Sequence, residues 1–93
     1  MSITDDLCKR SETYNKNLIN GLVNDLKSQV DKNINNMKYY ADKGYRSYDL
    51  RNKFSECSQL RQAINRLDEE HYKGLYYKFT NGSFYCTASV YWL

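Results

Sequence analysis

Side chains that bind metals or carry out chemistry are scarce in this sequence of 93 residues. It contains one histidine, His71, and three cysteines, Cys8, Cys57 and Cys86, which stand far apart. A zinc site needs several such residues at close spacing, as in CxxC or HxxxH, and neither pattern occurs. We therefore expect no metal site and no cofactor.

The same scarcity argues against an enzyme. Catalysis by an imidazole or a thiol needs an oriented partner set, and His71 follows three acids in a manner typical of a helix end or loop. Cys57 and Cys86 fall on predicted core faces, where cysteine behaves as a small hydrophobe. The acids 68–70 fit a solvated helix end, and the four glycines stand too far apart for a phosphate-binding loop. We expect a non-enzymatic protein with no catalytic residues.

Long apolar runs are also missing. No stretch approaches the ~20 apolar residues of a transmembrane helix, and the start, MSITDDLCKR, lacks the apolar core of a signal peptide. We expect a protein that is neither membrane-bound nor exported through a signal peptide, with free thiols in a reducing compartment. A disulfide between two of the three cysteines is the alternative.

What the sequence does contain begins with a long helical pattern. Apolar residues recur every three or four positions from Ile3 to Ala41, which places them on one stripe of a helix. Ser2 with Asp5 fits an N-terminal capping pattern, and Gly44 suits a left-handed C-terminal cap. The sequence therefore predicts one helix over about residues 2–43.

The length of this helix raises a question of space. Unbroken, it would be ~60 Å long at 1.5 Å per residue, whereas a compact domain of this size is about 25 to 30 Å across. Either the helix breaks within residues 11–16, or its N-terminal part, residues 1–20, extends from the domain and contacts another chain.

A strand and a second helix follow. Residues 45–50, YRSYDL, alternate as a short strand does, and residues 51–53 form a polar connection. The second helix is predicted to begin at Ser55, its N-cap, and to end at the acids 68–70.

The end of the chain carries a hairpin signal. Asn81-Gly82 lies between two aromatic runs, which predicts a two-residue turn with Tyr77 opposite Cys86. The whole chain, residues 1–93, is then one α+β domain of the order αβαββ. Its three-stranded sheet packs its apolar face on both helices.

Four short segments form a recognisable order. A helix ends in AxxG at residues 41–44, the strand YRSYDL follows, the second helix ends in RLDEEHYKG, and the hairpin ends in SVYWL. This order resembles that of small proteins encoded by tailed bacteriophages. The resemblance covers about residues 30–93. It implies a viral accessory protein or virion component, located in the host cytoplasm or the virion, and it brings no catalytic residue set.

Aromatic and apolar side chains exceed what a chain of this length is expected to cover. Tyrosine is enriched at protein interfaces, and an uncovered helical stripe marks a contact surface. We therefore expect a homo-oligomer, or contacts with a host or viral protein as an inhibitor or virion component. The candidate interface residues are Tyr76, Lys78, Tyr85 and Tyr91 on the sheet and Leu7, Tyr14 and Leu18 on the helix.

The alternative is a module that binds nucleic acid or nucleotides through residues 38–53. Cations there interleave with tyrosines, and such a mixture can hold phosphates while rings stack on bases. The net charge of +3 permits this function without arguing for it. The candidate residues are Lys38, Tyr40, Lys43, Tyr45, Arg46, Tyr48, Arg51 and Lys53.

Overall fold

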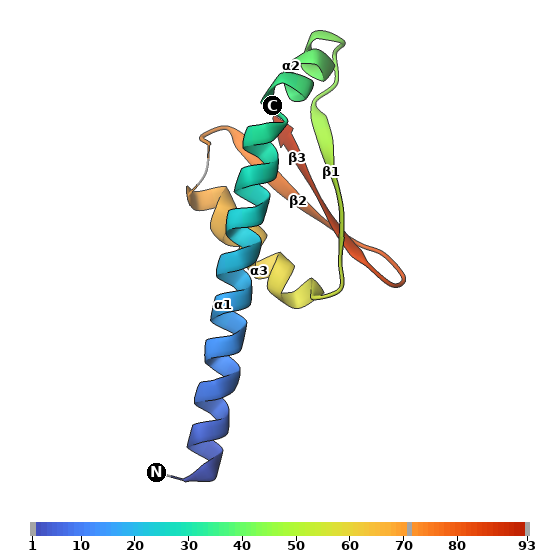
Figure 1. Cartoon of the computed structure of the whole chain (residues 1–93). Helices are drawn as coiled ribbons and strands as arrows, with labels where there is room; N and C mark the ends of the chain where they lie inside the picture. Colours follow the sequence, from blue (N-terminus) through green and yellow to red (C-terminus); the bar gives the residue numbers. More distant parts are fainter. Residues whose placement is uncertain (1, 71, 93) are drawn as a thin grey trace.

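The computed structural model describes residues 2–70 and 72–92, and of residues 51, 52, 69 and 70 it describes the backbone alone. The elements in chain order are α1 (Ile3–Lys32), α2 (Ile34–Asp42), β1 (Ser47–Phe54), α3 (Cys57–Glu70), β2 (Leu75–Asn81) and β3 (Cys86–Trp92) (Figure 1). The expected α+β class and the helix–strand–helix–hairpin order are confirmed.

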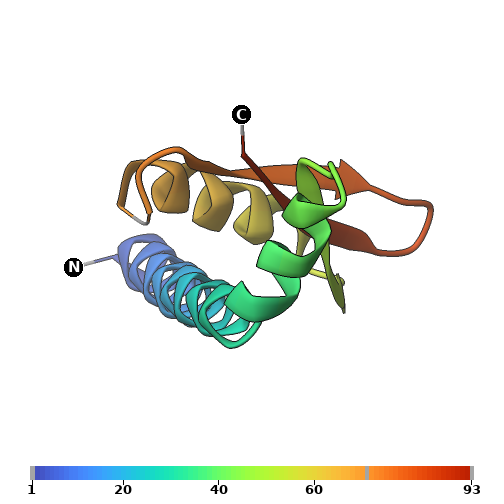
Figure 2. The ribbon, with the colours of Figure 1, turned by 90° about the horizontal axis from the view of Figure 1, so that it is seen from above.

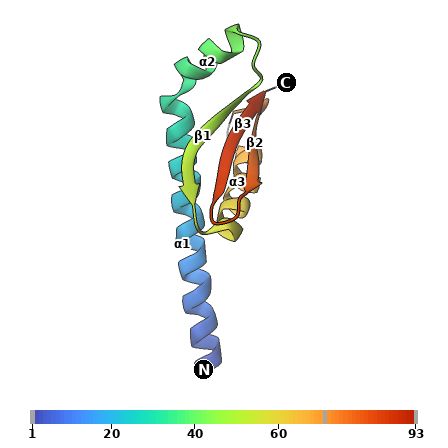
Figure 3. The ribbon, with the colours of Figure 1, turned by 90° about the vertical axis from the view of Figure 1, so that its right-hand side faces the viewer.

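The strands form one antiparallel sheet in the order β1-β3-β2. Helices α1 and α3 lie side by side on one face of this sheet, as Figures 2 and 3 show, and α2 continues the chain towards the start of β1. The molecule therefore has two layers, with the central strand β3 hydrogen-bonded on both edges.

Helix α1 extends well beyond the sheet. It runs without interruption through residues 11–16, so the expected break there is wrong, and the other expectation, an extending N-terminal part, holds. Ser2 caps the helix by accepting a hydrogen bond from the backbone N–H of Asp5 at 3.2 Å. The extension makes the molecule 59 Å long, against 29 and 20 Å in the other two directions (Figure 1).

The predicted single helix is instead divided at Asn33. Its side-chain amide donates to the carbonyl of Gln29 at 2.7 Å, and its backbone N–H donates to Val30 at 3.0 Å. Asparagine interrupts helices in this way because its side chain competes for backbone hydrogen bonds. The chain then restarts as α2, which ends as predicted before Gly44, where φ is +89°.

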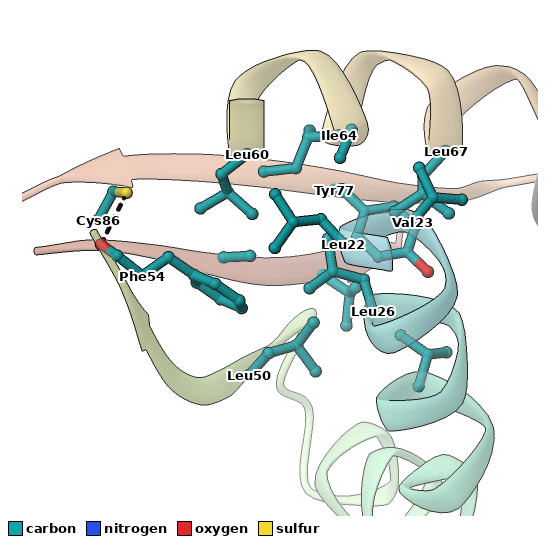
Figure 4. Close-up of a cluster of buried hydrophobic side chains, with 14 of the residues drawn as sticks. Leu22, Val23, Leu26, Leu50, Phe54, Leu60, Ile64, Leu67, Tyr77 and Cys86 are labelled. Atoms are coloured by element: carbon teal, nitrogen blue, oxygen red, sulfur yellow. Dashed lines mark hydrogen bonds between the residues drawn. The ribbon is translucent and has the colours of Figure 1, made fainter. Parts of the chain in front are cut away.

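The core lies between the two long helices and the inner face of the sheet (Figure 4). Leu26 and Val30 of α1, Leu60 and Leu67 of α3 and Val90 of β3 are completely buried. Every one of them sits on an apolar stripe that the sequence spacing had indicated. The remaining buried residues are Leu22, Val23, Met37, Leu50, Phe54, Ala63, Ile64, Tyr77, Cys86 and Ala88.

The hairpin register differs from the prediction. Tyr77 pairs with Val90 rather than Cys86, and Asn81 pairs with Cys86, so residues 82–85 form a four-residue loop. The N–H of Gly82 donates to the carbonyl of Tyr85 at 2.8 Å across this loop. The shift moves each partner by four positions, and an even shift keeps every side chain on its face. For that reason the facing pattern could not distinguish the two registers.

Two boundaries also differ from the prediction. Strand β1 continues to Phe54 through the predicted polar connection, and its register is interrupted between Leu50 and Lys53, as in a β-bulge. Helix α3 begins at Cys57, two residues after the predicted cap Ser55. The carbonyl of Glu56, the residue before the helix, accepts a hydrogen bond from the backbone N–H of Leu60.

Two of the three cysteines are paired. Cys57, in the first turn of α3, and Cys86, at the start of β3, form a disulfide with their Cα atoms 5.7 Å apart. The pair lies beside the carbonyl of Phe54, which is 3.1 Å from the sulfur of Cys86 (Figure 4). The expectation of free thiols is therefore wrong for these two residues and holds only for Cys8, which is exposed.

Across the described residues, no helix combines the length and apolar character needed to cross a bilayer.

Candidate functional site

The outer face of the sheet, which points away from α1 and α3, is a grid of polar and aromatic side chains. Its central column on β3 is half-buried, whereas its two flanking columns are exposed. Three cross-strand rows follow from the register: Ser47, Tyr91 and Tyr76; Asp49, Ser89 and Lys78; and Lys53, Thr87 and Thr80.

An aromatic pair occupies one end of this face. The rings of Tyr76 and Tyr91 are stacked, with centroids 5.5 Å apart and planes inclined by 27°. Three of the predicted sheet residues, Tyr76, Lys78 and Tyr91, thus lie together on the outer face. Tyrosine there offers flat apolar area with a hydroxyl at the rim, which suits a protein contact.

Tyr85 does not lie on a strand, contrary to the prediction. It belongs to the hairpin loop, where it is exposed, and the ammonium of Lys53 is 5.5 Å from its ring centroid. Because Lys53 belongs to the outer face, Tyr85 borders that face at the end opposite the stacked pair. Its neighbour Phe84 is 87% exposed, whereas the predicted two-residue turn would place Phe84 opposite Phe79 on the apolar face of the sheet.

The extending half of α1 is the second candidate surface. Residues 3–17 are exposed, except for the half-buried Asp6. The apolar side chains of Ile3, Leu7 and Tyr14 are 71%, 56% and 63% exposed. Leu18 is half-buried and already packs against the core. The candidate stripe therefore runs from open solvent at Ile3 to the edge of the domain at Leu18.

The tyrosines of residues 38–53 gather into one cluster, which we call the tyrosine corner: Tyr39, Tyr40, Tyr45 and Tyr48. Tyr40 is at its centre, with the other three ring centroids 5.6 to 5.7 Å away. The hydroxyl of Tyr48 donates to the side-chain oxygen of Asn33 at 3.1 Å, which ties the corner to the helix break. Tyr40 and Tyr48 are therefore partly covered within the protein, whereas Tyr39 and Tyr45 remain exposed.

The cations of this segment do not all join the tyrosine corner. Lys43 does, because its ammonium lies 4.9 Å from the ring centroid of Tyr39. Lys38 and Arg46 are exposed nearby in the sequence, whereas Lys53 is at the far end of β1, beside Tyr85. The side chain of Arg51 lies outside the described part of the structure. The predicted residues whose side chains the structure describes therefore do not form one site, because Lys53 lies apart from the tyrosine corner.

Two carboxylates have roles that the sequence did not suggest. Asp68 accepts a hydrogen bond from the backbone N–H of Tyr77 at 2.8 Å, which links α3 to β2. Asp31 accepts from the hydroxyl of Tyr72 at 2.7 Å, and this hydrogen bond raises the pKa of Tyr72. Burial, followed by the charges of Asp31 and Asp68, raises the pKa of Tyr77 well above its usual range.

Carboxylates elsewhere do not converge. Within residues 2–70 and 72–92, no three His, Cys, Asp or Glu side chains come together as a metal ion would require. His71 and the side chains of Glu69 and Glu70, considered above as a helix end, lie outside the described part of the structure.

No protein-family model, no curated protein and no solved structure matches this chain.

Proposed function

We propose that this chain is a non-enzymatic accessory protein of a phage or similar virus that acts through protein contacts and associates with copies of itself. The observation that carries the proposal is the extending half of α1, on which Ile3, Leu7 and Tyr14 lie exposed in a row. The viral assignment follows from the resemblance of residues 30–93 to phage proteins.

An uncovered helix of this kind is unfavourable for a monomer. Isolated helical segments shorter than about 12 to 15 residues are marginal in water, and most helices are stabilised by packing of their apolar face. Burying a leucine or isoleucine side chain contributes roughly 1.5 to 3 kcal/mol. A partner that covers the stripe would therefore stabilise both the extension and the complex.

The outer face of the sheet leaves room for a second partner. It is on the opposite side of the sheet from the helices (Figure 3), so self-association through α1 does not cover it. The stacked pair Tyr76 and Tyr91, with Lys78 beside it, is the part we assign to a virion neighbour or an inhibited host factor.

The oligomeric state tests the proposal. Sedimentation over a wide concentration range should give a mass that rises above that of one chain, 11.1 kDa. The double variant L7Q/Y14Q should remain a single chain, because it removes the stripe. The control E12Q/K16Q changes two exposed polar residues of the same helix and should behave like the parent. A mass of one chain at every concentration would overturn the proposal.

A second candidate function, binding of single-stranded nucleic acid or nucleotides, is favoured by one observation. Tyr39 and Tyr45 of the tyrosine corner are both more than half exposed, and Lys43 lies over Tyr39. An exposed ring beside a cation can take a base and its phosphate together. The charge near the corner is modest, so this function ranks second.

A further inference from the structure

We infer that two copies of this chain pair through residues 3–18 of α1 as antiparallel helices, related by a two-fold axis that passes between Arg10 and Ser11. This inference rests on the proposed self-association and specifies its partner, its direction and its register.

The spacing of the apolar residues carries the register. Ile3 and Leu18 are equally far from the midpoint between Arg10 and Ser11, and so are Leu7 and Tyr14. In an antiparallel pair centred there, Leu7 lies beside Tyr14 of the second copy. Ile3 in the same way lies beside Leu18. A two-fold interface requires a surface that is complementary to itself in this sense.

The stripe also points in a suitable direction. At about 100° per residue, Ile3, Leu7 and Tyr14 fall within a sector of about 40°. Two α1 residues that form hydrogen bonds with α3 are Asn15, a partner of Gln59, and Asn20, a partner of Arg66. Measured around the helix axis, Asn15 lies about 100° from the middle of that sector on one side, and Asn20 lies about 120° from it on the other side. The stripe therefore faces away from α3, and a second helix can lie along it.

The charged residues of the extension lie mostly away from the apolar stripe. Lys9, Glu12 and Lys16 fall on the side of the helix opposite the stripe, and all three are exposed. The one charge close to the stripe is Arg10, which is paired with Asp6 of its own helix at 3.0 Å. The extension is thus amphipathic, and no other part of the chain that the structure describes buries its apolar side.

The antiparallel direction follows from the position of the domain. Helix α3 reaches α1 at Asn15, whose side chain accepts a hydrogen bond from Gln59, and the turns of α1 that precede it extend past the domain (Figure 1). Antiparallel pairing places the two domains at opposite ends of the helix pair, whereas parallel pairing would bring both to the same end. The contact is about 22 Å long at 1.5 Å per residue, which is short for a permanent dimer, so we expect association that depends on concentration.

Complementary variants test direction and register together. L7D and Y14K should each weaken self-association by about tenfold or more, because each places a charge in the apolar stripe. In an equimolar mixture, antiparallel pairing sets the L7D position against the Y14K position at one end. At the other end it leaves the parent Leu–Tyr contact. The mixture should therefore sediment as a heterodimer at concentrations where each variant alone remains a single chain.

Each outcome of the mixture decides the inference. A parallel pair would align each position with itself, so the mixture would form no Asp–Lys pair and no parent contact at either position, and it should remain far weaker than the parent protein. That result, with a parent protein that still associates, would overturn the inference and leave the proposed function standing. A parent protein that stays a single chain would overturn both.

Cross-linking provides an independent measurement in the C8S background, which keeps the Cys57–Cys86 disulfide. L7C mixed with Y14C should form an intermolecular disulfide at least tenfold faster than either variant alone. Faster linking of L7C to itself would indicate parallel helices and contradict the inference.

Discussion

The rings of Tyr76 and Tyr91 stack across β2 and β3 with their centroids 5.5 Å apart. Tyr91 is on the central strand and is half-covered, whereas Tyr76 is on an edge strand and remains exposed. The outer face of the sheet therefore presents one ordered aromatic pair.

This stacking should be measurable as a coupling energy. We expect a double-mutant cycle of Y76A and Y91A, read by urea denaturation, to give an interaction of about 0.5 to 1.5 kcal/mol. The cross-strand pair Thr80 and Thr87, which contains no rings, is the matched control on the same face. Additive effects for the tyrosine pair would show that the stack contributes nothing to stability.

The disulfide should be a major source of stability. Cys57 and Cys86 close a loop with a sequence separation of 29, and a cross-link over such a loop contributes roughly 3 to 4 kcal/mol in the chain-entropy model. We expect the unfolding midpoint in urea to fall markedly on adding a reductant, or in C57A/C86A. C8S changes an exposed free thiol and should leave the midpoint in place.

A count of thiols checks the same pairing directly. The oxidised protein, denatured without reductant, should react as one free thiol. Three reactive thiols would mean that Cys57 and Cys86 are not joined.

Two glycines should respond to alanine in opposite directions. Gly21 is inside α1, and a Cβ there would meet no heavy atom of the described residues within 4 Å. G21A should therefore raise the free energy of unfolding by about 0.5 to 1 kcal/mol. Gly44 has a φ of +89°, which is strained for alanine, so G44A should lower the free energy of unfolding by about 1 kcal/mol or more. Thermal or urea unfolding of both variants checks the pair, and equal effects would contradict the two assignments.

Stability should decline in alkaline solution because of Tyr77. Its pKa is raised in the folded protein by burial and by the nearby charges of Asp31 and Asp68. The folded state thus holds the phenol proton more tightly than the unfolded state, whose pKa is about 10. The stabilisation that comes from the raised pKa of Tyr77 is fully present below about pH 10 and is lost progressively as the pH rises above that value.

The variant Y77F isolates this effect. Urea denaturation near neutral pH and at about pH 11 should show a smaller decrease in the free energy of unfolding for Y77F than for the parent. Both proteins carry C8S, which prevents disulfide exchange at high pH. Y14F, at an exposed tyrosine, should keep the full loss. An unchanged loss in Y77F would show that other groups cause it.

Oligonucleotide binding tests the second candidate function. If the tyrosine corner holds a single strand, Y39A should weaken binding, since stacking contributes about 1 to 3 kcal/mol per base. K43Q should also reduce the salt slope by about one. Y76A, on the outer face, is the control. No binding at low salt would remove this function from consideration.

Some of the fold was predictable from particular residues. The stripe from Leu22 to Val30 and the stripe from Leu60 to Leu67 are buried as their spacing indicated. Gly44 ends its helix with a positive φ. These features depend on contacts within a few residues, for which the local pattern contains the necessary information.

Other features depend on partners distant in sequence. The four-residue hairpin loop cannot be distinguished by facing pattern, because an even shift preserves both faces. The length of the loop follows from the register in which β3 pairs with β1 and β2. The Cys57–Cys86 disulfide depends on how α3 packs against the sheet. The sequence placed Tyr85 on a strand and missed the roles of Asp31 and Asp68 for the same reason.

By itself, the sequence determined the order of helices and strands and the buried stripes of α1 and α3, because periodicity is a local property. Only the tertiary structure decided that Leu18 is already half-covered while Ile3, Leu7 and Tyr14 extend beyond the domain. An apolar stripe has the same spacing whether its own chain or another covers it, and only the packed arrangement of α1, α3 and the sheet separates the two cases.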